Sequence, residues 1–235
     1  MEPATVVTLA KNHGDALDES AVAARYATRD FSAFIEAYKW VTSYLRAPAD
    51  YALVASRMAE QMLAQSVVYA EVTLSAGVML LRKQDVEEIG GPDSVRDAVE
   101  ILRAERIGHG IAAAADPELM ALLAERSIGL EICPTSNLRT GALARLLGRA
   151  DAGLPDHPLP QLFRAGIPIS LSTDDPAMFD TSLVREFGAL EQMTLRKQEI
   201  LSIAEGAFAG AFLPPTEKAA FRQAFRVKAA PLGLL

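Results

Sequence analysis

Three short apolar segments, each followed by a helical pattern, run in succession between residues 106 and 200. The segments cover residues 106–111, 128–133 and 167–171, and the linkers between them have ordinary lengths. Strands that alternate with helices in this way are typical of parallel βαβ construction. The sequence therefore predicts an α/β fold with a parallel sheet.

Polar side chains lie at or after the end of each of the three segments. His109 lies near the end of the first segment, a predicted exit loop over residues 134–137 follows the second, and Asp174 and Asp175 follow the third. Parallel strands end at the same edge of a sheet or barrel, and the chemistry of α/β proteins collects at that edge. We therefore expect these side chains to converge on one face of the fold.

The adjacent carboxylates of Asp174 and Asp175 admit two interpretations. Like charges held side by side in a partly dry site are costly unless a cation or a hydrogen-bonding ligand offsets them, and carboxylates are metal ligands. Alternatively, the pair caps the next helix, with Pro176 in the first turn. Residues 172–176 alone do not decide between a ligand site and a helix cap.

His109 lies between two glycines, which let the backbone and a ligand approach closely. Taken alone, it would be an ordinary histidine with its hydrogen bonds satisfied. Together with the aspartate pair on a neighbouring strand end, it indicates a site. In such a site a neutral imidazole orients or deprotonates a water, while a carboxylate holds a metal ion. We expect His13 to be a surface residue favoured by the helix dipole, and His157 to have a structural role.

The chain before these units is predicted to be mostly helical, with helices over residues 4–12, 31–45 and 50–65. Residues 67–75 are short and rich in β-branched side chains, so they predict a buried strand. A carboxylate within such a strand needs a partner. We expect Glu71 to form an ion pair at the strand end.

Composition argues against several classes of function. The 235 residues carry a formal net charge of −7, whereas a nucleic-acid or anionic-membrane surface needs a basic patch. No apolar run approaches the roughly 20 residues of a membrane span. A single cysteine, Cys133, excludes an internal disulfide, and without a secretory signal the chain is expected in the cytoplasm. We expect one domain over residues 1–235.

Four motifs follow one another along the chain: RIGHG at 106–110, EICPTSN at 131–137, HPL at 157–159 and STDDPAMF at 172–179. In order and spacing they resemble motifs of the adenosine deaminase family, and the resemblance extends over most of the chain. The family is a (β/α)8 TIM barrel of metal-dependent hydrolases. The resemblance implies a partial barrel of this type here, lacking several strand-helix units.

The resemblance also implies a reaction and roles for individual residues. The reaction is hydrolytic deamination of a 6-aminopurine nucleoside, such as adenosine or aminodeoxyfutalosine, by a Zn2+-bound water. By position, His109 resembles the water-activating histidine of the family and Asp174 its metal-ligand aspartate. Asp175 resembles the aspartate that accepts a hydrogen bond from the purine, and Glu88 falls where the catalytic glutamate is expected.

The chain departs from the family at the metal ligands. Family members carry His-x-His on a first strand, and this chain starts after that point. They also carry His-Ala-Gly-Glu on a fifth strand, where this chain has Asp85, Val86 and Glu87 ahead of Glu88. The segment from Ser75 to Glu88 is too short for two strand-helix units. Because three of four zinc ligands are missing, we expect weak Zn2+ binding and impaired catalysis.

A barrel that lacks strands exposes strand edges and an apolar interior. An open partial sheet, a homo-oligomer in which two copies cover the edges, or poor solubility would follow. The alternative function is a non-catalytic module of the same fold that binds a purine or a protein partner. An unrelated α/β hydrolase or binding protein is the third interpretation, and the four motifs in order argue against it.

Overall fold

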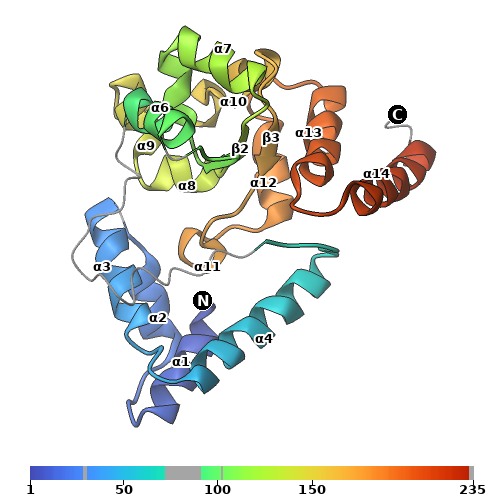
Figure 1. Ribbon diagram of the computed structural model, residues 1–235. Coiled ribbons are helices and arrows are strands. Elements are labelled where there is room, and N and C mark those ends of the chain that lie inside the picture. The colour runs from blue at the N-terminus through green and yellow to red at the C-terminus, as the bar shows by residue number, and fades with distance from the viewer. Residues whose placement is uncertain (29–30, 72–90, 102, 233–235) are drawn as a thin grey trace.

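The computed structural model describes residues 1–28, 31–71, 91–101 and 103–232 (Figure 1). The N-terminal part is a helical unit, and the described strands all lie after residue 92. Helices predicted over 4–12, 31–45 and 50–65 are confirmed as α1, α3 and α4. The helical unit consists of α1 (Pro3–Asn12), α2 (Glu19–Tyr26), α3 (Phe31–Thr42) and α4 (Pro48–Ala64).

The described strands form one parallel sheet in the order β1-β2-β3. They are β1 (Arg106–Gly108), β2 (Gly129–Ile132) and β3 (Ile169–Leu171). In the central strand, Leu130 pairs with Ile107 of β1 on one side and with Ile169 of β3 on the other. The predicted parallel α/β construction is thereby confirmed.

Helices follow each strand and cover the sheet. The first of them, α7, begins at Pro117 because the Asp116 carboxylate accepts hydrogen bonds from the backbone N–H groups of Glu118 and Leu119, each at 3.0 Å. The helices of this part are α6 (Pro92–Glu100), α7 (Pro117–Glu125), α8 (Pro134–Arg139), α9 (Ala142–Leu147), α10 (Leu159–Arg164), α11 (Pro176–Phe179), α12 (Leu183–Leu190), α13 (Lys197–Gly210) and α14 (Pro215–Ala229).

Two apolar cores organise the described residues. One core surrounds the sheet and includes the fully buried Leu130 and Ile132 of β2. The other lies in the helical unit, yet it takes in Met178 and Phe179 of α11. The rings of Phe34 and Phe179 stack there with their centroids 4.9 Å apart. Helix α11, which directly follows the aspartate pair, is therefore anchored in the core of the helical unit.

The predicted strand over residues 67–75 is not confirmed in its described part, because residues 67–71 form no strand. The remaining residues of that prediction lie outside the described ranges. Glu71 does form the predicted ion pair, with Arg106 of β1. The backbone N–H of Phe212 also donates to the Glu71 carboxylate, at 2.6 Å. An ion pair and a backbone hydrogen bond therefore hold this segment, and the hydrogen-bond ladder of a strand does not.

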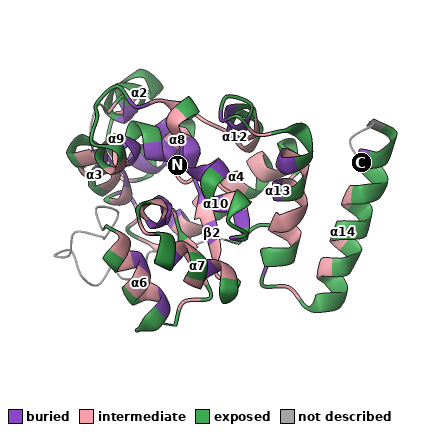
Figure 2. Ribbon diagram, turned by 90° about the horizontal axis from the view of Figure 1, so that it is seen from above, coloured by how far each residue is buried: buried purple, intermediate pink, exposed green. Residues whose placement is uncertain are grey.

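Helices α13 and α14, followed by a 3-10 helix at Ala230–Leu232, form the C-terminal part of the described chain. Helix α13 packs against β3, and a Cβ atom at Gly206 would lie in ordinary van der Waals contact with the Ile169 carbonyl oxygen, at 3.5 Å. Helix α14 packs on α13 through aromatic contacts and is otherwise largely exposed (Figure 2). Among the described helices, none is long and apolar enough to cross a membrane.

The turn after β1 yields a stability prediction. Gly110 has a φ of +68°, and a Cβ atom there would lie 2.7 Å from Cδ2 of the buried Leu130. We expect Gly110→Ala to lower the free energy of unfolding by about 2 kcal/mol, from backbone strain and overpacking together. Gly108→Ala is the matched control, because a Cβ atom there meets nothing within 4 Å.

Urea denaturation of the two variants measures this difference. We expect Gly108→Ala to stay within about 0.5 kcal/mol of the unsubstituted chain. Equal losses in both variants would show that the close approach of Gly110 to β2 does not constrain the turn.

Candidate functional site

The polar residues that follow the three strands meet at one edge of the sheet. Backbone hydrogen bonds extend the ladder beyond the strands, from His109 N to Glu131 O at 2.8 Å and from Ser172 N to Ile132 O at 3.0 Å. These bonds fix the backbone of both outer segments against β2. The predicted convergence of polar strand ends is therefore present in the structure.

Two residues at this edge hold an unusual backbone conformation. His109 has a φ of +60° and Asp174 a φ of +56°. Left-handed backbone is uncommon for residues other than glycine, although Asp and His adopt it more readily than most, and it costs about 1–2 kcal/mol. Such strain persists where the surrounding structure enforces it, and it clusters at functional sites. Seven described residues other than glycine have a positive φ, and five of them lie outside this site, so the conformation alone does not mark it.

The side chains of His109 and Asp174 approach each other. His109 Nε2 lies 3.8 Å from Asp174 Oδ2, which is an ion-pair distance but too long for a direct hydrogen bond. The Ser136 hydroxyl, from α8, donates to the same Asp174 oxygen at 2.7 Å. One carboxylate oxygen is thus held by a hydroxyl and faced by an imidazole.

Asp175 is the N-cap residue of α11, with Pro176 in the first turn, as the helix-cap interpretation predicts. Its backbone carbonyl accepts hydrogen bonds from Met178 N and Phe179 N, both at 3.0 Å. Its side chain, however, makes no capping hydrogen bond. Burial, and then the negative charge of Asp175, raise the pKa of the Tyr26 phenol, which places this carboxylate near the helical unit.

A series of hydrogen bonds leads to the Nδ1 atom of His109. The Asn137 Nδ2 atom lies 3.1 Å from His109 Nδ1, and Asn137 Oδ1 lies 3.3 Å from His157 Nε2. The backbone N–H of Leu159 donates to His157 Nδ1 at 3.1 Å. Asn137 and His157 are 2% and 3% exposed, and burial lowers the pKa of His157 to about 4. His157 thus contacts the site through Asn137, and its burial is compatible with the expected structural role.

The segment 134–137, predicted as an exit loop, is instead the start of helix α8. Glu186 of α12, which is completely buried, accepts a hydrogen bond from Thr135 N at 3.1 Å and another from the Thr181 hydroxyl. A carboxylate that accepts from a first-turn N–H group supports a helix start. Sequence reasoning missed Glu186 because it lies 51 positions from Thr135 and no local pattern marks it.

Cys133 lies between β2 and α8 and is 5% exposed. Burial raises the pKa of its thiol, against a smaller opposing effect of His109. A buried thiol with a raised pKa contains little of the thiolate that would react.

The described residues do not assemble a metal site by themselves. No group of three or more His, Cys, Asp or Glu side chains suited to a metal ion occurs in the described ranges. A catalytic zinc ion takes three protein ligands, whereas this edge offers Asp174 with His109 beside it. Glu88, the predicted catalytic glutamate, lies outside the described residues, as does Asp85.

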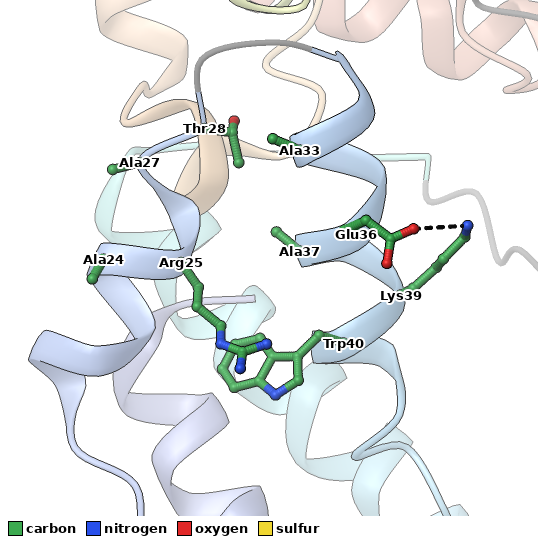
Figure 3. A pocket seen from close by; sticks show the side chains of 9 residues that line it. All are labelled: Ala24, Arg25, Ala27, Thr28, Ala33, Glu36, Ala37, Lys39 and Trp40. Carbon is green, nitrogen blue, oxygen red and sulfur yellow. Dashed lines mark hydrogen bonds and ion pairs between the residues drawn. The ribbon is translucent and has the colours of Figure 1, made fainter.

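A hollow of about 750 Å³ lies away from the strand ends, between α2 and α3 (Figure 3). All its lining residues fall between Ala24 and Trp40, and the Arg25 guanidinium lies over the Trp40 ring at 4.4 Å. None of the polar strand ends lines this hollow. We therefore assign the candidate site to the sheet edge, where the chemically competent side chains converge, and not to this hollow.

Comparison with known sequences identifies relatives of the chain. A family model described as adenosine deaminase matches it in two segments, residues 1–89 and 84–227. Over 97 residues the chain is 56% identical to the aminodeoxyfutalosine deaminase of Acidothermus cellulolyticus, covering 41% of this chain and 25% of the relative. Over 140 residues it is 40% identical to the adenosine deaminase of Serratia proteamaculans, covering 59% and 40%. The chain thus spans less than half the length of these curated relatives.

Solved structures share the fold. An adenine deaminase from Arthrobacter aurescens matches with a TM-score of 0.73 and 18% identity, over 97% of this chain and 95% of that chain. An amidohydrolase from Burkholderia ambifaria, solved with bound zinc, matches with a TM-score of 0.55 and 24% identity, over 63% and 39%. At these identities the likeness shows the fold alone. It supports the predicted α/β fold related to the TIM barrel.

The buried imidazole of His157 leads to a prediction about acid stability. Burial lowers its pKa to about 4 from an ordinary value of 6.5. Between these values the unfolded chain binds more protons than the folded chain, so the stability is fully present above pH 6.5 and is lost as the pH falls toward 4. Over that interval we expect His157→Gln, which does not titrate, to lose about 2–3 kcal/mol less than the unsubstituted chain.

Urea denaturation at a series of pH values measures this difference in slope. Parallel pH profiles for the two proteins would show that protonation of His157 does not oppose folding.

Proposed function

The chain belongs to the adenosine deaminase family, and we propose that it carries the purine-facing part of a site for hydrolytic deamination of a 6-aminopurine nucleoside. In this reaction a water molecule replaces the amino group at the purine C6 position and ammonia leaves. The observation that carries the proposal is the convergence of His109, Ser136 and Asp174 at one edge of the parallel sheet. The similarity to curated adenosine and aminodeoxyfutalosine deaminases supports the same reaction.

We assign roles to the residues by position and chemistry. His109 faces Asp174 across 3.8 Å, where an imidazole can orient a bound water. Asp174 stays oriented because Ser136 donates to it. Asp175 follows directly and offers carboxylate oxygens as acceptors for an N–H group of the purine. Glu88, outside the described residues, remains the proposed proton-transferring carboxylate.

A metal cofactor is suggested by the family and by the zinc-bound amidohydrolase of the same fold, and we propose Zn2+ as that metal. When bound, such an ion lowers the pKa of a water molecule so that a nucleophile exists at neutral pH. The described part of the chain supplies Asp174 toward it, with Ser136 fixing the carboxylate. Because the described residues do not complete a ligand set, we propose that this chain alone is impaired in catalysis.

The same observation favours a second candidate function. A chain that keeps the purine-facing residues, and whose described residues contain no complete metal site, would act as a non-catalytic module that binds a purine nucleoside or a protein partner. Within the described sheet, β1 and β3 are each paired on one edge only, so a second copy could cover the other edge. We propose a cytoplasmic location, where the unpaired Cys133 stays reduced.

The first experiment compares adenosine binding and adenosine turnover. Calorimetric titration of the full chain with adenosine should show binding that weakens about tenfold to a hundredfold in Asp175→Asn, because a hydrogen bond to a charged acceptor is lost. Asp180→Asn is the matched control, since its side chain is 78% exposed and forms an ion pair with the exposed Arg185. The control should bind adenosine like the unsubstituted chain.

Turnover is followed by ultraviolet absorbance with added Zn2+, beside Asp174→Asn. We expect no activity above that of the Asp174→Asn variant. Turnover that disappears in this variant would refute the proposed impairment and favour the enzyme. A folded chain that does not bind adenosine would refute the purine-facing site itself.

A further inference from the structure

The hydrogen bonds that lead to His109 Nδ1 run in one direction from donor to acceptor, and a backbone N–H group sets that direction. The N–H of Leu159 can only donate, and it lies 3.1 Å from His157 Nδ1. In a neutral imidazole one nitrogen accepts while the other carries the proton. Because burial keeps the His157 ring neutral near pH 7, its proton is on Nε2.

This direction passes on through Asn137. A side-chain amide has one accepting end and one donating end, so Asn137 Oδ1 faces the N–H of His157 at 3.3 Å. The amide nitrogen is left to donate to His109 Nδ1, at 3.1 Å. Turning the amide over would set a donor against the His157 N–H group and an acceptor against the His109 lone pair. Because Asn137 is only 2% exposed, bulk water would not compensate for either mismatch.

We propose that His157 and Asn137 are positioning residues that fix the tautomer of His109, with its proton on Nε2. His109 therefore presents an N–H donor toward Asp174 and toward any oxygen atom bound beside it. Of the two roles that the sequence allows for this imidazole, orienting a water by donating to its oxygen fits this tautomer. Accepting a proton at Nε2 does not, because that nitrogen already carries one.

We call the hydrogen-bonded series from Leu159 N through His157 and Asn137 to His109 the relay. The relay also explains why the hydrogen-bonding groups of the buried Asn137 and His157 side chains have partners without water. Each of their polar atoms facing the relay has one partner of the opposite kind, from Leu159 N to His109 Nδ1. The Ser136 hydroxyl meets Asp174 from the neighbouring position in α8. One short helix therefore orients both the imidazole and the carboxylate. The inference about catalysis rests on the proposed function, whereas the tautomer itself does not.

Long-range proton–nitrogen correlation spectra of the imidazole rings test the proposal. The chain has only three histidines, so single substitutions assign every ring. Near neutral pH, without substrate or metal, we expect His109 and His157 both to carry the proton on Nε2. A His109 ring with its proton on Nδ1 would overturn the proposal.

Two substitutions at His157 separate the relay from its structural surroundings. His157→Gln keeps a donor near the position of Nε2, so His109 should remain with its proton on Nε2. His157→Asn keeps an acceptor for Leu159 N but removes the donor to Asn137, so His109 should become a mixture of tautomers. Identical His109 spectra in the two variants would count against relay control.

Asn137→Asp offers a third outcome. A carboxylate only accepts, so it would draw an N–H from both rings and place a proton on His109 Nδ1. An amide backbone spectrum like that of the unsubstituted chain verifies that each variant is folded. Because these readouts need no adenosine, a failure of the relay is distinguishable from a failure of adenosine binding.

Discussion

The pairing of β2 on both of its edges is the constraint from which the candidate site follows. Leu130 pairs with Ile107 on one side and with Ile169 on the other, and its own side chain is fully buried. A slip of either outer strand by one residue would turn its side chains to the opposite face of the sheet. His109 and Asp174 lie within 3.8 Å of each other because this double register holds.

A second constraint comes from the helical unit, which shares its core with α11. Phe179 stacks on Phe34, so the helix that begins after Asp175 is fixed at both ends, by β3 and by α3. The aspartate pair thus lies where two parts of the chain meet, each with its own apolar core. Changes in the packing of α3 would reach the site through α11 without touching its polar residues.

The sequence predicts local structure and the convergence of strand ends well, and it predicts partners poorly. The strands near 106, 128 and 167 could be predicted because they are short apolar runs, a signal carried by neighbouring residues in the sequence. Helix α8 was expected as a loop because its support, Glu186, comes from a distant helix. The ion pair of Glu71 could be expected from the cost of burying a carboxylate, yet its partner Arg106 is fixed only by the fold. The contact of His157 with Asn137 likewise spans 20 positions.

The single thiol of the chain can report how often the structure around the sheet edge opens. Cys133 is buried where β2 passes into α8, beside the polar residues of the site. An alkylating reagent reaches such a sulfur only while the local structure is open, so its labelling rate reports the free energy of that opening. Because no second cysteine competes for the reagent, the protein carries its own probe for the rigidity of this edge.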